Sequence, residues 1–251
     1  MNKNVLAFNN DETMEVEQES LNDDSKKNRR TKKNKKIEKI TKVGIPYFIF
    51  QKIVDIFSGL VGTLILIPVT LMVYILRLVK HEDDGPIFYT QLRIGKNGKE
   101  FKLYKFRTMV MHADEKLFKY LEENKEARKE YKKYKKLKND PRITKVGEFL
   151  RNTSLDELPQ MLNILKGQMS LIGPRPYLYR EKEDMAPDYY KKIIKVNPGI
   201  TGYWQVNGRS NVDFQERTYM DTYYIEHRCI KMDIKIIIKT VLKILKKEGA
   251  Q

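Results

Sequence analysis

The chain has 251 residues, with 49 Lys and Arg against 33 Asp and Glu, which gives a formal net charge of +16 at neutral pH. One cysteine, Cys229, excludes an internal disulfide and a cysteine-rich zinc module, and three scattered histidines disfavour a histidine metal site. Any catalytic chemistry must therefore come from carboxylates, arginine and lysine.

Residues 1–42 form a tail that is first acidic and then basic. Residues 1–25 hold seven acids and one lysine, and residues 26–36 hold eight basic residues with no aromatic side chain among them. This composition predicts disorder. A basic run without stacking aromatics disfavours a nucleic-acid partner, so we expect none. Its position ahead of an apolar segment favours attraction to anionic membrane lipids and a cytoplasmic location.

Residues 43–80 contain the apolar segment, in which 21 consecutive positions from Ile56 to Leu76 carry no charge. The segment lies too far from Met1 for a cleaved signal peptide. Pro68 predicts a kink, because proline removes one backbone hydrogen bond of a helix. Basic residues flank both ends, so we expect both ends in the cytoplasm and a re-entrant membrane helix broken at Pro68. An ordinary tilted, proline-kinked span is the alternative.

Residues 81–251 are predicted to form a catalytic domain on the cytoplasmic face. Within residues 85–109, two short strand-like runs flank Asn97-Gly98, which is a strong hairpin signal. Residues 113–138 indicate one solvated helix with a single packed stripe. After residues 173–176, Gly-Pro-Arg-Pro, the pattern becomes irregular.

The C-terminal residues 233–247 place isoleucine, valine and leucine on one helical face and lysines mostly elsewhere. A membrane-surface helix and an ordinary packed helix both explain this pattern, and the lysines favour the former. The predicted fold class is therefore α/β of the α+β type: a mostly helical, monotopic membrane protein with a small β-hairpin and surface amphipathic helices.

Adjacent acids, Asp156 and Glu157, lie in a helical unit of residues 145–168 that is interrupted around Thr153-Ser154. A capping role is open, because Ser154-Leu155-Asp156-Glu157 matches the S-x-x-E capping box and acids suit a positive helix end. The same end also favours phosphate. Four cations lie on loops or strand ends that could converge there: Lys105, Arg107, Arg151 and Arg175.

Two chemistries use paired carboxylates, and the surrounding cations decide between them. Glycoside hydrolysis needs two carboxyl groups about 5 to 9 Å apart and no phosphate-binding cations. In phosphoryl transfer, one carboxylate attacks phosphorus to give an acyl phosphate, the other holds magnesium, and cations stabilise the transition state. The arginines and lysines favour phosphoryl transfer.

Four segments, in this order, resemble the bacterial sugar transferase family of monotopic phosphoglycosyl transferases. They are GPIFYTQLRIGKNGKEFKLYKFRTM, DPRITKVGEFLRNTSLDELPQMLNILKGQMSLIGPRP, VNPGITGYWQVNGRS and the stretch from Arg217 to Tyr224. The resemblance implies transfer of a sugar 1-phosphate from a UDP-sugar to undecaprenyl phosphate, with Mg2+ and a re-entrant helix in the bacterial inner membrane. It implies the first membrane step of exopolysaccharide, capsule or O-antigen lipopolysaccharide assembly.

The resemblance also implies roles for individual residues. Asp156 would be the nucleophile that releases UMP, and Glu157 would hold the magnesium ion. Asp221 would support the site. Phosphate or lipid-phosphate binding would fall to cations at matching positions: Lys105, Arg151 and Arg175, with Arg107 and Arg209 as further candidates. From residue type alone, each of these cations could equally form a surface salt bridge.

One departure from the family pattern is Ile67-Pro68, where Ser-Pro is common. Thr63 or Thr70 is expected to bond the carbonyls that the proline frees. The insertion at residues 113–138 resembles members that transfer hexose 1-phosphates such as galactose or glucose. The alternative function is a non-catalytic membrane adaptor that recruits glycosyltransferases. Downstream glycosyltransferases as partners of the enzyme, and a homodimer, stay open.

Overall fold

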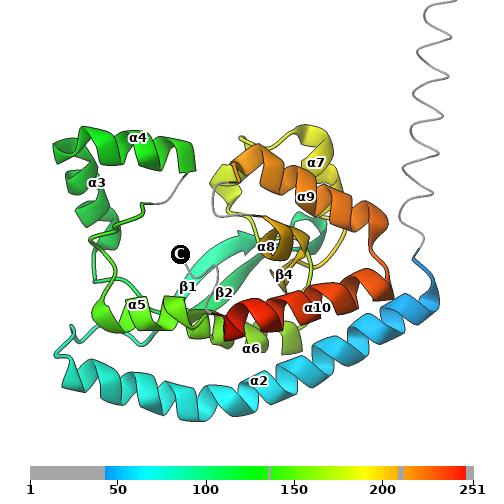
Figure 1. Ribbon diagram of the computed structural model, residues 1–251, viewed down its shortest axis with the longest axis horizontal. Coiled ribbons are helices and arrows are strands. Elements are labelled where there is room, and N and C mark those ends of the chain that lie inside the picture. Colours follow the sequence, from blue (N-terminus) through cyan, green and yellow to red (C-terminus); the bar gives the residue numbers. More distant parts are fainter. Residues whose placement is uncertain (1–42, 135–136, 209–211, 247–251) are drawn as a thin grey trace, which may run out of the picture. The chain divides into compact units, whose positions relative to one another are not determined.

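The long helix α2, Ile45–Val79, organises the fold in the computed structural model, which describes residues 43–134, 137–208 and 212–246. Its 35 residues correspond to about 50 Å of helix. The expected disordered tail of residues 1–42 lies outside the described residues. Figure 1 shows α2 as a shallow arc along one side of the unit formed by the described part of the chain.

One face of α2 packs against the rest of the unit, and the other is apolar and exposed. The buried positions recur every three, four, seven or eight residues, which is one helical face: Tyr47, Asp55, Gly59, Gly62, Leu66, Val73 and Arg77. The most apolar 18-residue window has a mean hydropathy of 2.3 and is only 22% buried. By length and composition, α2 could cross a membrane.

The helix is not divided at Pro68. Thr70 donates to the carbonyl of Leu66 at 2.7 Å, one turn back, rather than to the carbonyl of Leu64 that Pro68 leaves free. The hydroxyl of Thr63 is buried and has no partner among the described residues. The helix continues past one missing hydrogen bond, so the break expected at Pro68 and the expected threonine bonds are wrong in this structure. A re-entrant path through a membrane stays a prediction.

The predicted hairpin is confirmed. Strands β1, Phe88–Ile94, and β2, Glu100–Phe106, pair antiparallel around the short 3-10 turn η1, Lys96–Gly98. Asn97 and Gly98 both have positive φ, at 60° and 75°, the conformation that Asn-Gly turns adopt readily. Phe106 at the end of β2 is buried against Leu66 and Val73 of α2 in one hydrophobic cluster.

The charged stretch after the hairpin forms two helices, where one was predicted. They are α3, Ala113–Glu123, and α4, Lys125–Tyr134. Asn124 between them is extended, and its side chain bonds the carbonyl of Tyr120 at 3.0 Å. Arg128 donates to two further carbonyls of the last turn of α3. The predicted stripe is present in part: Leu117 is buried with Ala127 and with Leu137 beyond α4, and Tyr120, Leu121 and Tyr131 pack against this small core.

The interruption predicted near Thr153-Ser154 is present. It separates α5, Lys145–Asn152, from the 3-10 helix η2, Leu155–Gln160, and from α6, Met161–Leu165. Helix α6 lies directly on α2, where Gly59 and Gly62 leave room for it. A Cβ at Gly62 would come within 2.3 Å of Cγ of Met161, and one at Gly59 within 2.7 Å of Cδ2 of Leu165.

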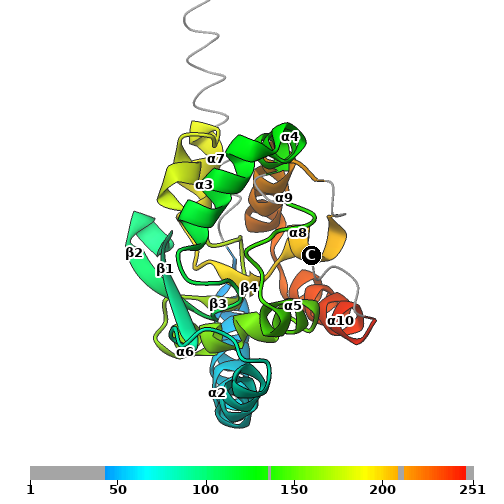
Figure 2. The same ribbon diagram turned by 90° about the vertical axis from the view of Figure 1, so that its left-hand side faces the viewer.

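The C-terminal half forms a second packed layer. A parallel pair of three-residue strands, β3 at Ser170–Ile172 and β4 at Gly199–Thr201, was not predicted. Around it lie the 3-10 helix η3, Tyr179–Lys182, and three helices: α7 at Pro187–Ile193, α8 at Tyr203–Asn207 and α9 at Phe214–His227. Figure 2 shows β3 and β4 above α2, with α8 and α9 beyond them.

The last helix is α10, at Ile230–Leu245. Asp233 and Ile236 are buried, whereas much of the predicted apolar face is exposed: Ile234, Ile238, Val241, Leu242 and Leu245. This exposure favours the membrane-surface interpretation over an ordinary packed helix. Asp233 accepts hydrogen bonds from the hydroxyls of Tyr47 and Tyr224, at 2.9 and 3.0 Å, which ties α10 to the start of α2.

Candidate functional site

The turn between α5 and η2 places the two adjacent acids. Ser154 has a positive φ of 57°, and its side chain makes no capping hydrogen bond. Asp156 and Glu157 therefore stand in the first turn of η2 without the capping box that the sequence pattern allows. Pro159 is the fifth residue of this short helix. The carboxylates are available for other partners.

Lys105 supplies the charge that holds the acids together. It lies near the end of β2, and its ammonium is 2.7 Å from Oε1 of Glu157 and 3.5 Å from Oδ2 of Asp156. The Asp156 side chain is 13% exposed and that of Glu157 is 36% exposed. The two predicted acids and the predicted lysine thus form one cluster, with Asp156 the more enclosed of the acids.

The environment separates the two acids electrostatically. Burial raises the pKa of Asp156, and the charge of Glu157 adds to this effect, while Lys105 opposes it. Burial also acts to raise the pKa of Glu157, but the charges of Lys105 and Arg175 outweigh it and the pKa is lowered. The surroundings therefore favour the charged form of Glu157 and disfavour the charged form of Asp156.

Arg151 lies on the last turn of α5, beside Asp156. Its Nε donates to the hydroxyl of Thr108 at 2.9 Å, which orients the guanidinium. Burial lowers the pKa of Arg151, while the negative charge of Asp156 acts in the opposite direction. Arg151 is therefore a second cation placed to act on a group bound at Asp156.

Asp221 fixes the loop that carries Arg175. It is fully buried on α9, and its Oδ2 accepts hydrogen bonds from the Arg175 backbone N–H at 3.0 Å and the Tyr177 hydroxyl at 2.7 Å. Burial raises the pKa of Asp221 to about 7. Asp221 thus holds the backbone of the Arg175 loop, and its expected support of the site stays a prediction. Tyr177 was not predicted, although it directly follows the Gly-Pro-Arg-Pro motif.

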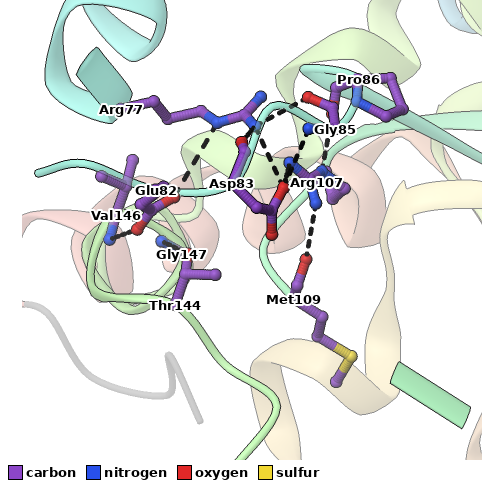
Figure 3. A network of polar contacts seen from close by, with 10 residues as sticks. All are labelled: Arg77, Glu82, Asp83, Gly85, Pro86, Arg107, Met109, Thr144, Val146 and Gly147. Carbon is purple, nitrogen blue, oxygen red and sulfur yellow. Dashed lines mark hydrogen bonds and ion pairs between the residues drawn. The ribbon is translucent and has the colours of Figure 1, made fainter. Parts of the chain in front are cut away.

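Arg107 is engaged elsewhere, as Figure 3 shows. Its guanidinium donates to the carbonyl of Pro86 at 2.7 Å and to the carboxylate of Asp83. Arg77 at the end of α2 donates to the carbonyls of Asp83 and Gly85 at 2.6 and 2.7 Å. Arg107 thus joins the hairpin to the end of α2, and the structure does not bring it into contact with the acid pair. Arg209 lies outside the described residues.

Metal ligands are few in this site. Across residues 43–134, 137–208 and 212–246 there is no group of three or more His, Cys, Asp or Glu side chains that could hold a metal ion. Glu157 offers a partly exposed, ionised carboxylate, and Mg2+ commonly binds through one or two carboxylates together with substrate phosphates. The residues present therefore fit a magnesium ion that arrives with a phosphate substrate.

Comparisons with known proteins identify the family of the chain. The family described as bacterial sugar transferase matches residues 46–247. The undecaprenyl-phosphate galactose phosphotransferase of Salmonella typhimurium is 47% identical over 189 residues, which are 74% of this chain and 39% of that protein. The UDP-glucose:undecaprenyl-phosphate glucose-1-phosphate transferase of Klebsiella pneumoniae is 40% identical, covering 78% of this chain and 40% of that protein.

The match to a shorter relative extends over most of that protein. The exopolysaccharide production protein ExoY of Sinorhizobium fredii is 40% identical over 198 residues, which are 78% of this chain and 85% of that protein. The chain spans about two fifths of the length of the Salmonella and Klebsiella proteins. Because the family match extends over about four fifths of the sequence, this chain belongs to the bacterial sugar transferase family.

Proposed function

We propose that the chain is a phosphoglycosyl transferase that moves a sugar 1-phosphate from a UDP-sugar to undecaprenyl phosphate, giving undecaprenyl-diphosphate-sugar and UMP. The observation that carries this proposal is the enclosed Asp156 beside Glu157, Lys105 and Arg151. Relatives named as undecaprenyl-phosphate galactose and glucose transferases support the same reaction class.

The reaction proceeds in two displacements at one phosphorus atom. A carboxylate oxygen of Asp156 attacks the phosphorus that carries the sugar, an O–P bond forms, and the bond to the UMP oxygen breaks with its electron pair leaving on UMP. A phosphate oxygen of undecaprenyl phosphate then attacks the same phosphorus. The acyl phosphate bond breaks, and Asp156 returns to its carboxylate form.

The surrounding side chains act on charge and position. Lys105 and Arg151 flank Asp156 and stabilise the negative charge that develops on the phosphoryl oxygens. Glu157 would hold Mg2+, which when bound supplies a further positive charge for the diphosphate. Arg175, which Asp221 positions through the backbone, is available for a phosphate group.

The contacts of α2 support a location on one side of the membrane. Tyr47 near its start bonds Asp233, and Val73 near its end is buried in one cluster with Phe106 and Leu150, so both ends contact the same unit. A helix that crossed the bilayer perpendicularly would separate its ends by about 30 Å of hydrocarbon. We therefore propose that α2 is re-entrant or lies within one leaflet of the bacterial inner membrane, with the catalytic unit on the cytoplasmic face.

The transferred sugar is proposed to be a hexose, galactose or glucose, as the names of the Salmonella and Klebsiella relatives suggest. The proposed pathway is exopolysaccharide assembly, in line with the name of ExoY, or capsule assembly. O-antigen assembly belongs to the same reaction class.

The test is UMP release by the full-length protein in nanodiscs with Mg2+, undecaprenyl phosphate and, in turn, UDP-galactose, UDP-glucose and UDP-N-acetylglucosamine. We expect UMP with a hexose donor and none from any donor after EDTA treatment. The matched control replaces undecaprenyl phosphate by undecaprenol, which lacks the accepting phosphate. Absence of UMP with every donor would reject the enzyme and favour the adaptor alternative.

A further inference from the structure

Two arginines converge on one tryptophan next to the candidate site. The Arg217 guanidinium carbon lies 5.2 Å from the centre of the Trp204 ring, and that of Arg175 lies 5.9 Å from it. Trp204 is on α8 and Arg217 on α9, which pack against each other (Figure 1). Arg217 was not predicted as a site residue.

Neither guanidinium has an acidic partner in the described part of the chain. Arg175 donates no side-chain hydrogen bond there, and Arg217 donates only to the carbonyl of Val212, at 3.1 and 3.0 Å from Nε and Nη2. The Trp204 ring offers no acceptor, because its Nε1–H is itself a donor and has no partner among the described residues. The cluster therefore has more donors than acceptors.

Positive charges also crowd this region. The charge of Arg175 lowers the pKa of Arg217 and of Arg93, in each case after burial as the larger cause. Arg93 donates to the carbonyl of Pro176, next to Arg175. Glu181 offsets part of the charge, but its carboxylate accepts a hydrogen bond from the Leu178 backbone. An anion between the arginines would relieve this repulsion.

Helix α9 positions both arginines. Asp221, one turn after Arg217 on α9, accepts the backbone N–H of Arg175 at 3.0 Å. The same helix thus fixes the loop of Arg175 and presents Arg217 toward the same ring. Arg175 also lies close enough to Glu157 to lower its pKa, so the arginine pair adjoins the acid pair.

We propose that Arg217 and Arg175 together bind one phosphate group beside Trp204. Paired guanidinium groups suit the oxygens of a phosphate, and each charged hydrogen bond is stronger than a neutral one. This inference rests on the proposed function for the source of the phosphate, which is either the diphosphate of the nucleotide sugar or the phosphate of the polyprenyl acceptor.

Trp204 provides a direct test, because it is the single tryptophan of the chain. The full-length protein in detergent is titrated with UDP, and separately with a short-chain polyprenyl phosphate, while Trp204 emission is followed. Uridine and the matching polyprenol serve as ligands without phosphate. We expect one phosphate ligand to change the emission and its phosphate-free counterpart to leave it unchanged, which identifies the source of the phosphate.

Variants then assign the effect to Arg217. Arg217→Gln should raise the Kd of that ligand about 10- to 100-fold, the range expected for losing a hydrogen bond to a charged group. Arg217→Lys, which keeps the charge but not the planar fork, should raise it less, and it serves in place of Arg217→Gln if the latter does not fold. Arg180→Gln removes an exposed arginine on η3 and is the matched control.

The outcomes separate this inference from the proposed function. Binding does not require turnover, so phosphate binding that depends on Arg217 supports the inference even if no UDP-sugar is consumed. Unchanged Kd values for UDP and for the polyprenyl phosphate in Arg217→Gln, or in Arg217→Lys where that variant replaces it, would overturn it. An equal response to uridine and UDP, together with an equal response to the polyprenol and its phosphate, would also overturn it.

Discussion

The carboxylates of the candidate site and those that hold α2 meet different kinds of partner. Asp55 in α2 accepts a hydrogen bond from the Leu171 backbone at 2.7 Å, and Asp233 accepts from two tyrosine hydroxyls. These donors are neutral and fixed in position. Asp156 and Glu157 instead face the charged, flexible side chain of Lys105 and retain some exposure.

The type of hydrogen-bond donor distinguishes carboxylates that hold helices together from carboxylates that can take part in a reaction. A buried carboxylate that accepts hydrogen bonds from a backbone amide or a tyrosine hydroxyl keeps these partners, because the fold holds the donors in place. A carboxylate held by a lysine can release it when a phosphate arrives, because the ammonium can bind the phosphate oxygens instead. The same residue type therefore forms a fixed contact in α2 and, in the proposed reaction, serves as a reactive group in η2.

The sharpest test of this contrast applies one substitution at both places. Asp156→Asn should lower UMP release at least about 1000-fold, because an amide cannot form the acyl phosphate, with little change in the thermal unfolding midpoint. Asp55→Asn keeps an acceptor oxygen for Leu171 and should retain most activity. Near-normal UMP release by Asp156→Asn would show that Asp156 is not the nucleophile. An equal loss of UMP release in Asp156→Asn and Asp55→Asn would contradict the difference between the two carboxylates.

The packing of α6 on α2 requires a residue without a side chain at position 62. Gly62→Ala would place a Cβ 2.3 Å from Met161 Cγ, so we expect the free energy of unfolding to fall by about 1–3 kcal/mol. Adding Met161→Ala should make the loss smaller than the sum of the two single losses. Gly44→Ala is the control, since its nearest neighbour is 3.4 Å away. Strict additivity of the two substitutions would contradict this packing.

Asp221 gives the smallest and most specific effect, a change in pH dependence. Its folded pKa of about 7 lies above the ordinary value near 4, so the folded state retains a proton that the unfolded state has lost. Its contribution to stability is present below about pH 4 and is lost as the pH rises through about 7. Asp221→Asn cannot lose this proton, so the variant should lose less stability than wild type as the pH rises. The measurement is the difference in thermal unfolding midpoint between pH 5 and pH 8.

Asp233 complicates the lower part of this range, because burial raises its pKa to about 6. The comparison is therefore wild type against Asp221→Asn at each pH, with Asp233 unchanged in both. An identical pH dependence in the two proteins would show that Asp221 does not hold the proton.

Local signals in the sequence predicted the elements whose geometry is local. Asn97-Gly98 specifies its turn through two positive φ values, and the interruption at Thr153-Ser154 was correctly placed. The strands β3 and β4 are three residues long and pair across 29 positions of the sequence, so no periodicity could reveal them. The break at Asn124 was missed because charged residues with high helix propensity flank it on both sides.

The candidate site was predictable in its chemistry and less so in its membership. Adjacent acids at a helix start, followed by the family resemblance, indicated Asp156, Glu157, Lys105 and Arg151, and these residues lie together. Arg107 has the same residue type and a nearby position on the hairpin, but it bonds Asp83, which follows α2. Tyr177 and Arg217 were not singled out, although Tyr177 follows the Gly-Pro-Arg-Pro motif and Arg217 begins a segment that resembles the family. Their contacts depend on where α9 packs.

Helix α6 packs directly on Gly59 and Gly62, so its position relative to the long helix α2 is fixed. Asp156, the proposed nucleophile, lies in the short helix η2 directly before α6. In the proposed membrane location, the depth of α2 in the bilayer would therefore set the height of Asp156. An acceptor with its chain in hydrocarbon and its phosphate at the surface varies little in height. The fixed contact between α6 and α2 would then let that phosphate reach Asp156 without leaving the membrane.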